Sequence, residues 1–447
     1  MHVKGSANRH FLSVALPLIV ASLISPLPGI VDTAILGHLG AVGYLSAVAA
    51  GSAIIGLIIW SFSFLRMGAT ATTARALGNG DIPTCQLLLA QSLVLALMLG
   101  TLIILARDLL LSAAFILIEP PAANLALSEA YVTIRIYGAP AVLGTFCLTG
   151  WLIGMQKARA ALLLLLLVNA LNVALDFIFI LGLGLNSTGA AMASLIAEGF
   201  GFFLGLFIVL RLTRGFPPSA TVAHSQLLKQ LGRLKAYGAL VTVNRHLLVR
   251  TACLIFIFTF FTAQGARQGA DTLAANAILM QLFFLFSFGL DGFAQATEAL
   301  TGQAVGAGKE RYFYQLCKLA AVWGFALAAV TTGLYLLCDH VIVRLFTDLD
   351  TVTNVALKHF AWLAAIPLAG VGAFLLDGIL LGAGKTRSMQ NIMLVAAFMV
   401  FLPLWWFTRG MGNHGLWLAF VAFMTARTLL MLLAFVFYSR QGWTRPI

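Results

Sequence analysis

Charged side chains are scarce in this sequence: only 9% of its 447 residues are Asp, Glu, Lys or Arg, whereas 61% are hydrophobic. A soluble globular protein carries about 25% charged residues, so the composition excludes a water-soluble enzyme and a disordered chain. The five cysteines show neither a CxxC motif nor the Cys/His spacing of a zinc site. They therefore indicate no disulfide scaffold and no metal site. The composition predicts an integral membrane protein.

Twelve apolar stretches are long enough to cross a bilayer as helices, which takes about 20 residues each. They cover roughly 11–36, 45–72, 84–107, 126–154, 158–182, 187–212, 237–264, 272–300, 312–338, 354–383, 387–408 and 413–438. Helices satisfy their own backbone groups in lipid, and the runs lack the alternation of a membrane β-barrel. The first stretch is too long, and too rich in Pro, for a cleavable signal peptide, so we expect it to form the first span.

Basic residues predict the orientation of these spans. Most of the 27 Lys and Arg residues lie in the segments on the same side as the N-terminus. By the positive-inside rule, both termini are expected in the cytoplasm, in a multi-pass protein of the inner membrane. This topology and anionic lipid explain the net charge of +12, so no nucleic-acid partner is needed.

The two halves of the chain resemble each other. The recurring landmarks, in order, are Gly150 and Gly154 with Gly378 and Gly382, Lys157 and Arg159 with Lys385 and Arg387, and Gly78 and Gly80 with Gly306 and Gly308. We therefore expect an N-lobe at 1–213, a cytoplasmic linker at 214–236 and a C-lobe at 237–447. With six helices each, the two bundles would run parallel, related by a pseudo-twofold axis along the membrane normal. This architecture is typical of a secondary transporter.

An ATP-driven pump or another enzyme does not fit the sequence. The segment before Gly384 and Lys385 resembles a phosphate-binding loop, but position 379 is Ile where that motif requires Gly. The cytoplasmic segments are also too short for a nucleotide-binding domain. We therefore expect no enzymatic activity and no cofactor, and a monomer in which uphill transport is coupled to an ion.

Six of the 15 acidic residues fall inside predicted spans: Asp32, Asp176, Glu198, Asp291, Glu298 and Asp377. A charge at the bilayer centre costs about 2.5–3.5 kcal/mol on insertion scales, so each embedded acid is a candidate for function. In such surroundings a carboxylate gains from protonation.

Asp32 follows three prolines, Pro17, Pro26 and Pro28, in the first span. Prolines remove backbone hydrogen bonds and bend a helix, so Pro17 and Pro26 are candidate hinges. A carboxylate that gains and loses a proton beside such a hinge can act as a coupling switch. The alternative is an interfacial Asp that caps the end of the helix.

Asn169, Asn172 and Asp176 follow the spacing i, i+3, i+7 and share one helical face, which we call the polar stripe. On an otherwise apolar helix this stripe must face protein or water. Its alternative role is to hold helices together. If Asp32 and Asp176 are adjacent, they would form a proton site with coupled titration.

The C-terminal half carries a second set of candidates. Asp291 and Glu298 share one helical face, and Arg250 and Arg245 in the preceding span could neutralise them. A structural ion-pair network and a role in transport both remain open. Asp377 corresponds to Thr149 in the other half, so the halves are not equivalent in chemistry. We also expect a buried pair between Glu198 and Arg66.

Several motifs resemble the multidrug and toxic compound extrusion (MATE) family, and within it the DinF-like branch. They are Leu27-Pro-Gly-Ile-Val-Asp32-Thr-Ala-Ile-Leu-Gly-His38, Leu65-Arg-Met67, Asn172-Val-Ala-Leu-Asp176 and Leu290-Asp-Gly-Phe-Ala294. The resemblance covers essentially the whole chain. It implies an antiporter that exports organic cations and other xenobiotics by alternating access, driven by inward flow of H+ or Na+.

The resemblance also implies a proton or cation site in the N-lobe. Its members would be Asp32, Asn172, Asp176, Tyr131 and Ser194, with Asn169 on the same stripe and the bending proline at Pro17. A pocket asparagine of some relatives is Thr149 here. The seventh-helix glutamate of the Na+ site in the NorM branch has no counterpart in 237–264, which favours protons at Asp32.

Three hypotheses follow for the function. The first is export of organic cations driven by H+ through protonation of Asp32 and bending of the first span. The second is a Na+-coupled antiporter of the same fold. The third is a lipid-precursor flippase, which would need several free cationic side chains for a pyrophosphate. The embedded candidates are Arg66, Arg135, Arg245, Arg250 and Arg427.

Overall fold

The computed structural model describes residues 2–37, 42–118, 124–216 and 229–443. Every regular element in this part of the chain is a helix. Eleven helical segments in the described residues are long and apolar enough to cross a membrane, and the number is twelve if the pair Leu125–Ile136 and Ala139–Gly154, which is bent by 50°, forms one span. The predicted all-α membrane fold is confirmed with these eleven to twelve candidate spans, and the observed segments coincide with the predicted ones.

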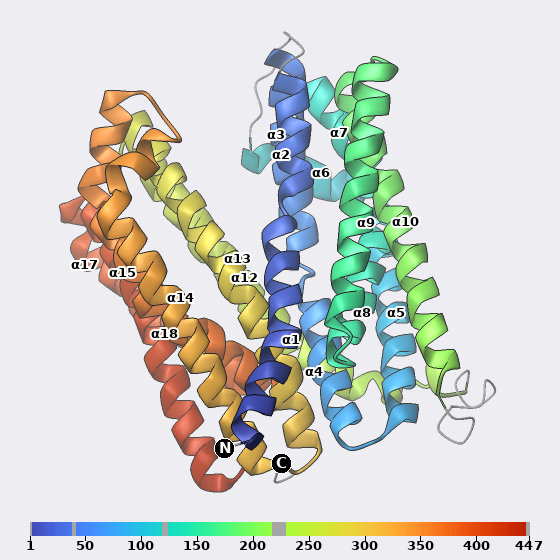
Figure 1. The fold of residues 1–447 in the computed structure, drawn as a ribbon. Helices are drawn as coiled ribbons and strands as arrows, with labels where there is room; N and C mark the ends of the chain where they lie inside the picture. Colours follow the sequence, from blue (N-terminus) through green and yellow to red (C-terminus); the bar gives the residue numbers. More distant parts are fainter. Residues whose placement is uncertain (1, 38–41, 119–123, 217–228, 444–447) are drawn as a thin grey trace. The chain divides into compact units, whose positions relative to one another are not determined.

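Residues 23–76 and 81–241 form one compact unit, the N-terminal unit. Its helices are α2 (Leu27–Gly37), α3 (Val42–Trp60), α4 (Phe64–Gly78), α5 (Ile82–Leu105), α6 (Arg107–Ile118), α7 (Leu125–Ile136), α8 (Ala139–Gly154), α9 (Ala158–Asp176) with the π-helix η2 (Phe177–Gly182), and α10 (Asn186–Arg214). Helix α10 packs against α7, α8 and α9, and α5 packs against α8 (Figure 1). This packing places the polar stripe of α9 inside the bundle.

Residues 1–22, 77–80 and 242–447 form the second unit, the C-terminal unit. Its helices are α1 (His2–Ile24), α12 (Gly238–Ala266), α13 (Ala270–Gly306), α14 (Glu310–Arg344), α15 (Asp350–Gly382), α16 (Thr386–Leu394) with the π-helix η5 (Val395–Phe401), α17 (Leu402–Thr408), η6 (Arg409–Met411) and α18 (Asn413–Gln441). The short helix η4 (Leu234–Tyr237) and the first residues of α12 still belong to the N-terminal unit. Helix α15 packs against α13, α14 and α18. It is therefore the central helix of this unit.

The first span is broken and shared between the two units. Helix α1 ends at Ile24 and α2 begins at Leu27, so Pro26 lies in the break, whereas Pro17 lies inside α1. Residues up to 22 pack with the C-terminal unit, and residues from 23 onward pack with the N-terminal unit. The hinge roles of the two prolines stay a prediction. So do the predicted lobe boundaries and the linker 214–236, of which 217–228 lie outside the described residues.

Glycines that recur in the two halves allow the same close helix packing in each unit. A side chain at Gly150 of α8 would collide with the backbone oxygen of Arg66 in α4. In the other unit, a Cβ atom on Gly378 of α15 would lie 2.5 Å from the backbone oxygen of Ala294 in α13. Small residues of this kind let helices approach closely inside a membrane. The sequence repeat thus reflects equivalent helix contacts.

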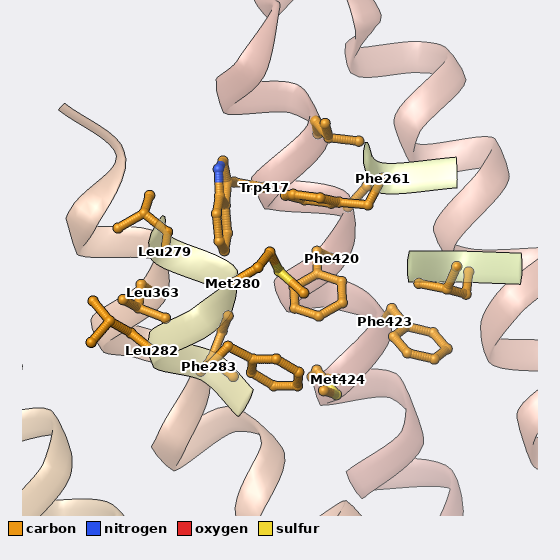
Figure 2. Close-up of a cluster of buried hydrophobic side chains, with 14 of the residues drawn as sticks. Phe261, Leu279, Met280, Leu282, Phe283, Leu363, Trp417, Phe420, Phe423 and Met424 are labelled. Carbon is orange, nitrogen blue, oxygen red and sulfur yellow. The ribbon is translucent and has the colours of Figure 1, made fainter. Parts of the chain in front are cut away.

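Aromatic side chains fill the core of the C-terminal unit (Figure 2). The rings of Phe261 and Trp417 meet edge to face with centroids 4.9 Å apart, and Phe283 meets Phe420 in the same way at 5.4 Å. Such aromatic pairs contribute roughly 0.5–1.5 kcal/mol beyond the area they bury. Trp417 also donates to Oδ1 of Asn276, which exchanges two hydrogen bonds with Asn413. This core holds α12, α13 and α18 together.

Candidate functional site: a carboxyl pair

The N-terminal unit brings Asp32 of α2 and Asp176 of α9 together. Their side chains are buried, with exposed fractions of 4% and 0%, and their carboxyl groups lie within hydrogen-bonding distance of each other. Among the described residues, no N–H or O–H group of another residue donates to either oxygen of Asp176 or to Oδ1 of Asp32. A hydrogen bond between two carboxyl groups requires a proton on one of them. We call Asp32 and Asp176 the carboxyl pair.

Asp176 occupies a special place in its helix. It is the last residue of α9, and the chain continues directly into the π-helix η2. π-Helical turns are rare and frequently occur at functional sites.

The other members of the polar stripe connect the carboxyl pair to its surroundings. Nδ2 of Asn172 donates to Oγ of Ser194 on α10 over 3.3 Å. Nδ2 of Asn169 donates to the backbone oxygen of Ile24 over 3.1 Å. In an intact helix that oxygen would accept the N–H four residues later, but this residue is Pro28, which has no N–H. Asn169 therefore supplies the donor that is missing at the break in the first span.

An ion pair and a tyrosine lie beside the carboxyl pair. Nη1 of Arg135 on α7 is 2.7 Å from Oε1 of Glu198 on α10, and Arg135 also acts electrostatically on both Asp32 and Asp176. One turn before Arg135, the hydroxyl of Tyr131 is 3.0 Å from Oγ of Ser52 on α3. The Arg135–Glu198 ion pair is neutral, so a single proton on the carboxyl pair would leave the site with one net negative charge.

The expected partner of Glu198 was wrong: Glu198 pairs with Arg135 and not with Arg66. The sequence contains the signal for this pair, because Tyr131 and Arg135 are four residues apart on one helical face, as are Ser194 and Glu198 on another. Each of these two helical faces thus carries one hydroxyl group and one charged group, and the charges are opposite in sign. Arg135 is thus a residue of the site that the family resemblance did not include.

In the C-terminal unit, the buried acid Asp377 is paired with arginines and not with a second carboxyl group. Oδ2 of Asp377 on α15 accepts hydrogen bonds from Nη2 of Arg250 on α12 over 2.5 Å and from Nη2 of Arg427 on α18 over 2.8 Å. The side chains of Asp377 and Arg427 are 5% and 2% exposed. Arginine remains charged in proteins. Asp377 is therefore held by two permanent positive charges.

Asp291 and Glu298 lie near this ion pair. Both act electrostatically on Arg250, as predicted for the structural network, but Arg250 forms its direct ion pair with Asp377. Arg245 lines a cavity at the start of α12, and its expected role in neutralising Asp291 and Glu298 stays a prediction. Thr149, the counterpart of Asp377, donates its hydroxyl to the backbone oxygen of Thr145 in its own helix.

No group of three or more His, Cys, Asp or Glu side chains in the described parts of the chain is arranged to hold a metal ion. The candidate site is thus built from carboxyl, amide, hydroxyl and guanidinium groups, which can exchange a proton or receive a cation.

Comparison with known proteins identifies the family. The family model MatE matches residues 17–178 and 247–407, more than half of the chain. The chain belongs to the MATE family. Members of this family are transporters, so the prediction that the chain is not an enzyme is confirmed.

The relatives of this MATE protein cover nearly its whole length. DNA damage-inducible protein F of Escherichia coli (strain K12) is 36% identical over 429 residues, which are 95% of this chain and 91% of that protein. The multidrug resistance protein MdtK of Photorhabdus laumondii subsp. laumondii is 23% identical over 458 residues, 98% of this chain and 95% of MdtK. The resemblance to the DinF-like branch is therefore confirmed.

A solved structure supports the fold. The outward-facing conformation of a multidrug resistance MATE family transporter of the MOP superfamily matches with a TM-score of 0.85. The identity is 18%, and the match covers 97% of this chain and 96% of that one. The chain is a multi-pass membrane protein with the MATE fold.

Proposed function

We propose that this MATE protein is a multidrug efflux antiporter that exports organic cations and other xenobiotics by alternating access, driven by inward flow of H+. The observation that carries the proposal is the carboxyl pair: two buried carboxyl groups that face each other without another described donor to Asp176. The names of the relatives, which include a multidrug resistance protein, support the substrate class.

Charge balance at the site explains why a cation and a proton exchange. With one shared proton the carboxyl pair has a net negative charge, which attracts a monovalent organic cation into surroundings where charges interact strongly. A second proton makes the pair neutral and removes that attraction. The cation and the second proton therefore compete for the same charge, and by linkage each weakens the binding of the other.

The break in the first span connects this exchange to a conformational change. Asp32 lies six residues after Pro26, which is about 1.7 helical turns. Asn169, which shares the polar stripe with Asp176, donates a hydrogen bond to the Ile24 oxygen at the break. A change in protonation of the carboxyl pair alters the interactions of α2 and α9 on both sides of that break. We expect the first span to bend at Pro17 or Pro26 when the second proton binds.

The ion pairs of the structure argue against the two alternative functions, a lipid-precursor flippase and a Na+-coupled antiporter. A flippase for lipid precursors needs several free cationic groups for a pyrophosphate, but three of the five embedded arginines are in ion pairs: Arg135 with Glu198, and Arg250 and Arg427 with Asp377. A Na+ site of the NorM kind would use the acid in the tenth span, and that acid, Asp377, is bound by two arginines. Both observations favour protons at Asp32.

The test uses the purified full chain in proteoliposomes loaded with a fluorescent organic cation such as ethidium. A pH gradient and a Na+ gradient are imposed separately, at equal membrane potential. We expect the pH gradient alone to drive transport. Transport driven only by the Na+ gradient would contradict the proposal, and so would equal dye movement in protein-free liposomes.

We also propose an inner-membrane location with both termini in the cytoplasm, and a monomer as the transporting form. The distribution of the 27 Lys and Arg residues supports the orientation. Labelling of single cysteines at Asp108 and Lys309, in whole cells, tests it: only position 108 should react with a membrane-impermeant reagent.

A further inference from the structure

A second polar site lies in the C-terminal unit, and none of the residues in the ion pairs of Asp377 lines it. It is a cavity of about 540 Å³ between α12 and α16. Its lining residues are Thr242, Arg245, His246 and Val249 from α12, and Arg387, Gln390 and Asn391 from α16. We call it the basic cavity. Its volume lies in the roughly 300–1,000 Å³ range of small-molecule sites.

The lining of the basic cavity is suited to an anion. The two guanidinium groups, Arg245 and Arg387, carry permanent charge and several donors in a fork geometry that matches the oxygens of phosphate or carboxylate. None of the described lining residues is acidic, and no described acid lies within ion-pair distance of either arginine. Five residues further along α12, Arg250 does have an acid, Asp377.

Neighbouring groups fix the geometry of the cavity. His246 is buried, and its Nδ1 lies 2.9 Å from Oγ1 of Thr386, the first residue of α16. This hydrogen bond joins α12 to α16 at the cavity wall. The N-terminus of a helix carries partial positive charge from its free N–H groups, so the start of α16 adds to the potential of the two arginines.

The depth of the cavity in the membrane indicates what kind of anion reaches it. Arg245 lies seven residues into α12, about 10 Å along the helix, and Arg387 is the second residue of α16. On the predicted topology both helices begin at the cytoplasmic face. Basic pockets between spans at this face are typical sites for anionic headgroups.

We propose that the basic cavity binds a phosphate group, with Arg245 and Arg387 as its ionic partners and Gln390 and Asn391 as further hydrogen-bond donors. The phosphate belongs either to an anionic lipid of the cytoplasmic leaflet or to a soluble anion. The bound group bridges α12 and α16 and stabilises the C-terminal unit. The site shares no residue with the carboxyl pair, so its test does not depend on the direction or coupling of transport.

The test measures binding to the full chain in detergent by native mass spectrometry and by the thermal unfolding temperature. The two arms are phosphatidylglycerol, with phosphatidylcholine as the neutral reference, and inorganic phosphate, with chloride at equal ionic strength. We expect retained ligand and a higher unfolding temperature in one arm. A response to phosphatidylglycerol alone assigns the phosphate to lipid, and a response to inorganic phosphate assigns it to a soluble anion.

Matched variants locate the binding. Arg245→Gln and Arg387→Gln should each weaken binding roughly tenfold, as expected for the loss of a charge-assisted hydrogen bond. Arg159→Gln is the control, because Arg159 is the exposed repeat counterpart of Arg387 on α9. The proposal is overturned if neither ligand binds the wild-type chain, or if the Arg245→Gln/Arg387→Gln double variant binds as tightly as the Arg159→Gln control. All three positions are exposed, so the variants are expected to fold.

Discussion

Each unit of this molecule buries acidic side chains in a bundle of the same kind, but with opposite partners. In the N-terminal unit, Asp32 and Asp176 face each other, and the neighbouring Arg135 is already paired with Glu198. In the C-terminal unit, Asp377 accepts hydrogen bonds from both Arg250 and Arg427. The first arrangement needs a proton to hold together, whereas the second is held by permanent charges.

Because of this difference, we expect the buried acids of the two units to have different roles. A carboxyl pair with one proton can take up a second proton or a cation in its place, so it can exchange ligands. A carboxylate between two arginines is already neutralised, so it gains little from binding a proton or a cation. Removal of one partner leaves a buried charge without compensation, which costs about 3–5 kcal/mol. We therefore expect Asp32 and Asp176 to couple proton uptake to substrate export, and Asp377 to stabilise the folded C-terminal unit.

The largest expected effect is on transport by Asp32→Asn. The amide cannot take up a proton, so efflux driven by a pH gradient should fall to the level of protein-free liposomes. Dye efflux from proteoliposomes measures this. Asp108→Asn is the control, because Asp108 is exposed and its ion pair is with the neighbouring Arg107. Efflux by Asp32→Asn at the rate of the control would contradict the assignment.

The next effect concerns the C-terminal unit. Asp377→Asn should lower the stability of the chain by about 3–5 kcal/mol, because Arg250 and Arg427 then lose their shared carboxylate. Thermal unfolding in detergent measures the change. The Asp377→Asn/Arg427→Met double variant should recover part of it, since one unpaired charge is gone. If Asp377→Asn is as stable as the wild-type chain, the ion pairs do not have the role described.

A third effect tests the charge of the N-terminal site. Glu198→Gln leaves Arg135 unpaired beside the carboxyl pair, so the net negative charge of the site disappears. The affinity for a monovalent organic cation should fall on the order of tenfold or more, as measured by fluorescence titration of the purified chain. Asp350→Asn, which breaks the exposed pair with Arg344, should leave the affinity unchanged. Equal affinities in both variants would argue against a cation site beside Arg135.

The smallest expected effect concerns the hydrogen bond between Asn169 and the break in the first span. Asn169→Leu removes one hydrogen bond at Ile24 and should cost about 1 kcal/mol of stability, together with slower efflux. Ser388→Ala removes one hydrogen bond to Tyr438 in the other unit and should cost a similar amount without slowing efflux. If the two variants slow efflux equally, Asn169 has no special connection to the break.

The sequence was sufficient to predict the spans and half of the site. Hydrophobic length alone places twelve spans, because lipid leaves the chain few alternatives to helices. The spacing of Asn169, Asn172 and Asp176 predicts one polar face, and α9 does bury all three side chains. The prolines of the first span indicated a break, and the structure places Pro26 in it.

Partners across helices could not be predicted in the same way. Helical spacing shows which residues share a face, but not which neighbouring helix that face contacts. For this reason the spacing could not identify Arg135, rather than Arg66, as the ion-pair partner of Glu198. Arg245 and Arg250 were treated together, although five residues rotate a helix by about 140° beyond a full turn. They therefore face different surroundings: Arg250 meets Asp377, and Arg245 lines the basic cavity.

Exchange at the N-terminal site requires that an organic cation and a proton compete for the carboxyl pair. The direct measurement is proton release when ethidium is added to the purified full chain in weakly buffered detergent with a pH indicator. We expect release of protons by the wild-type chain and by Asp108→Asn, and none by Asp32→Asn. Ethidium binding without proton release in the wild-type chain, or equal release by Asp32→Asn, would contradict it.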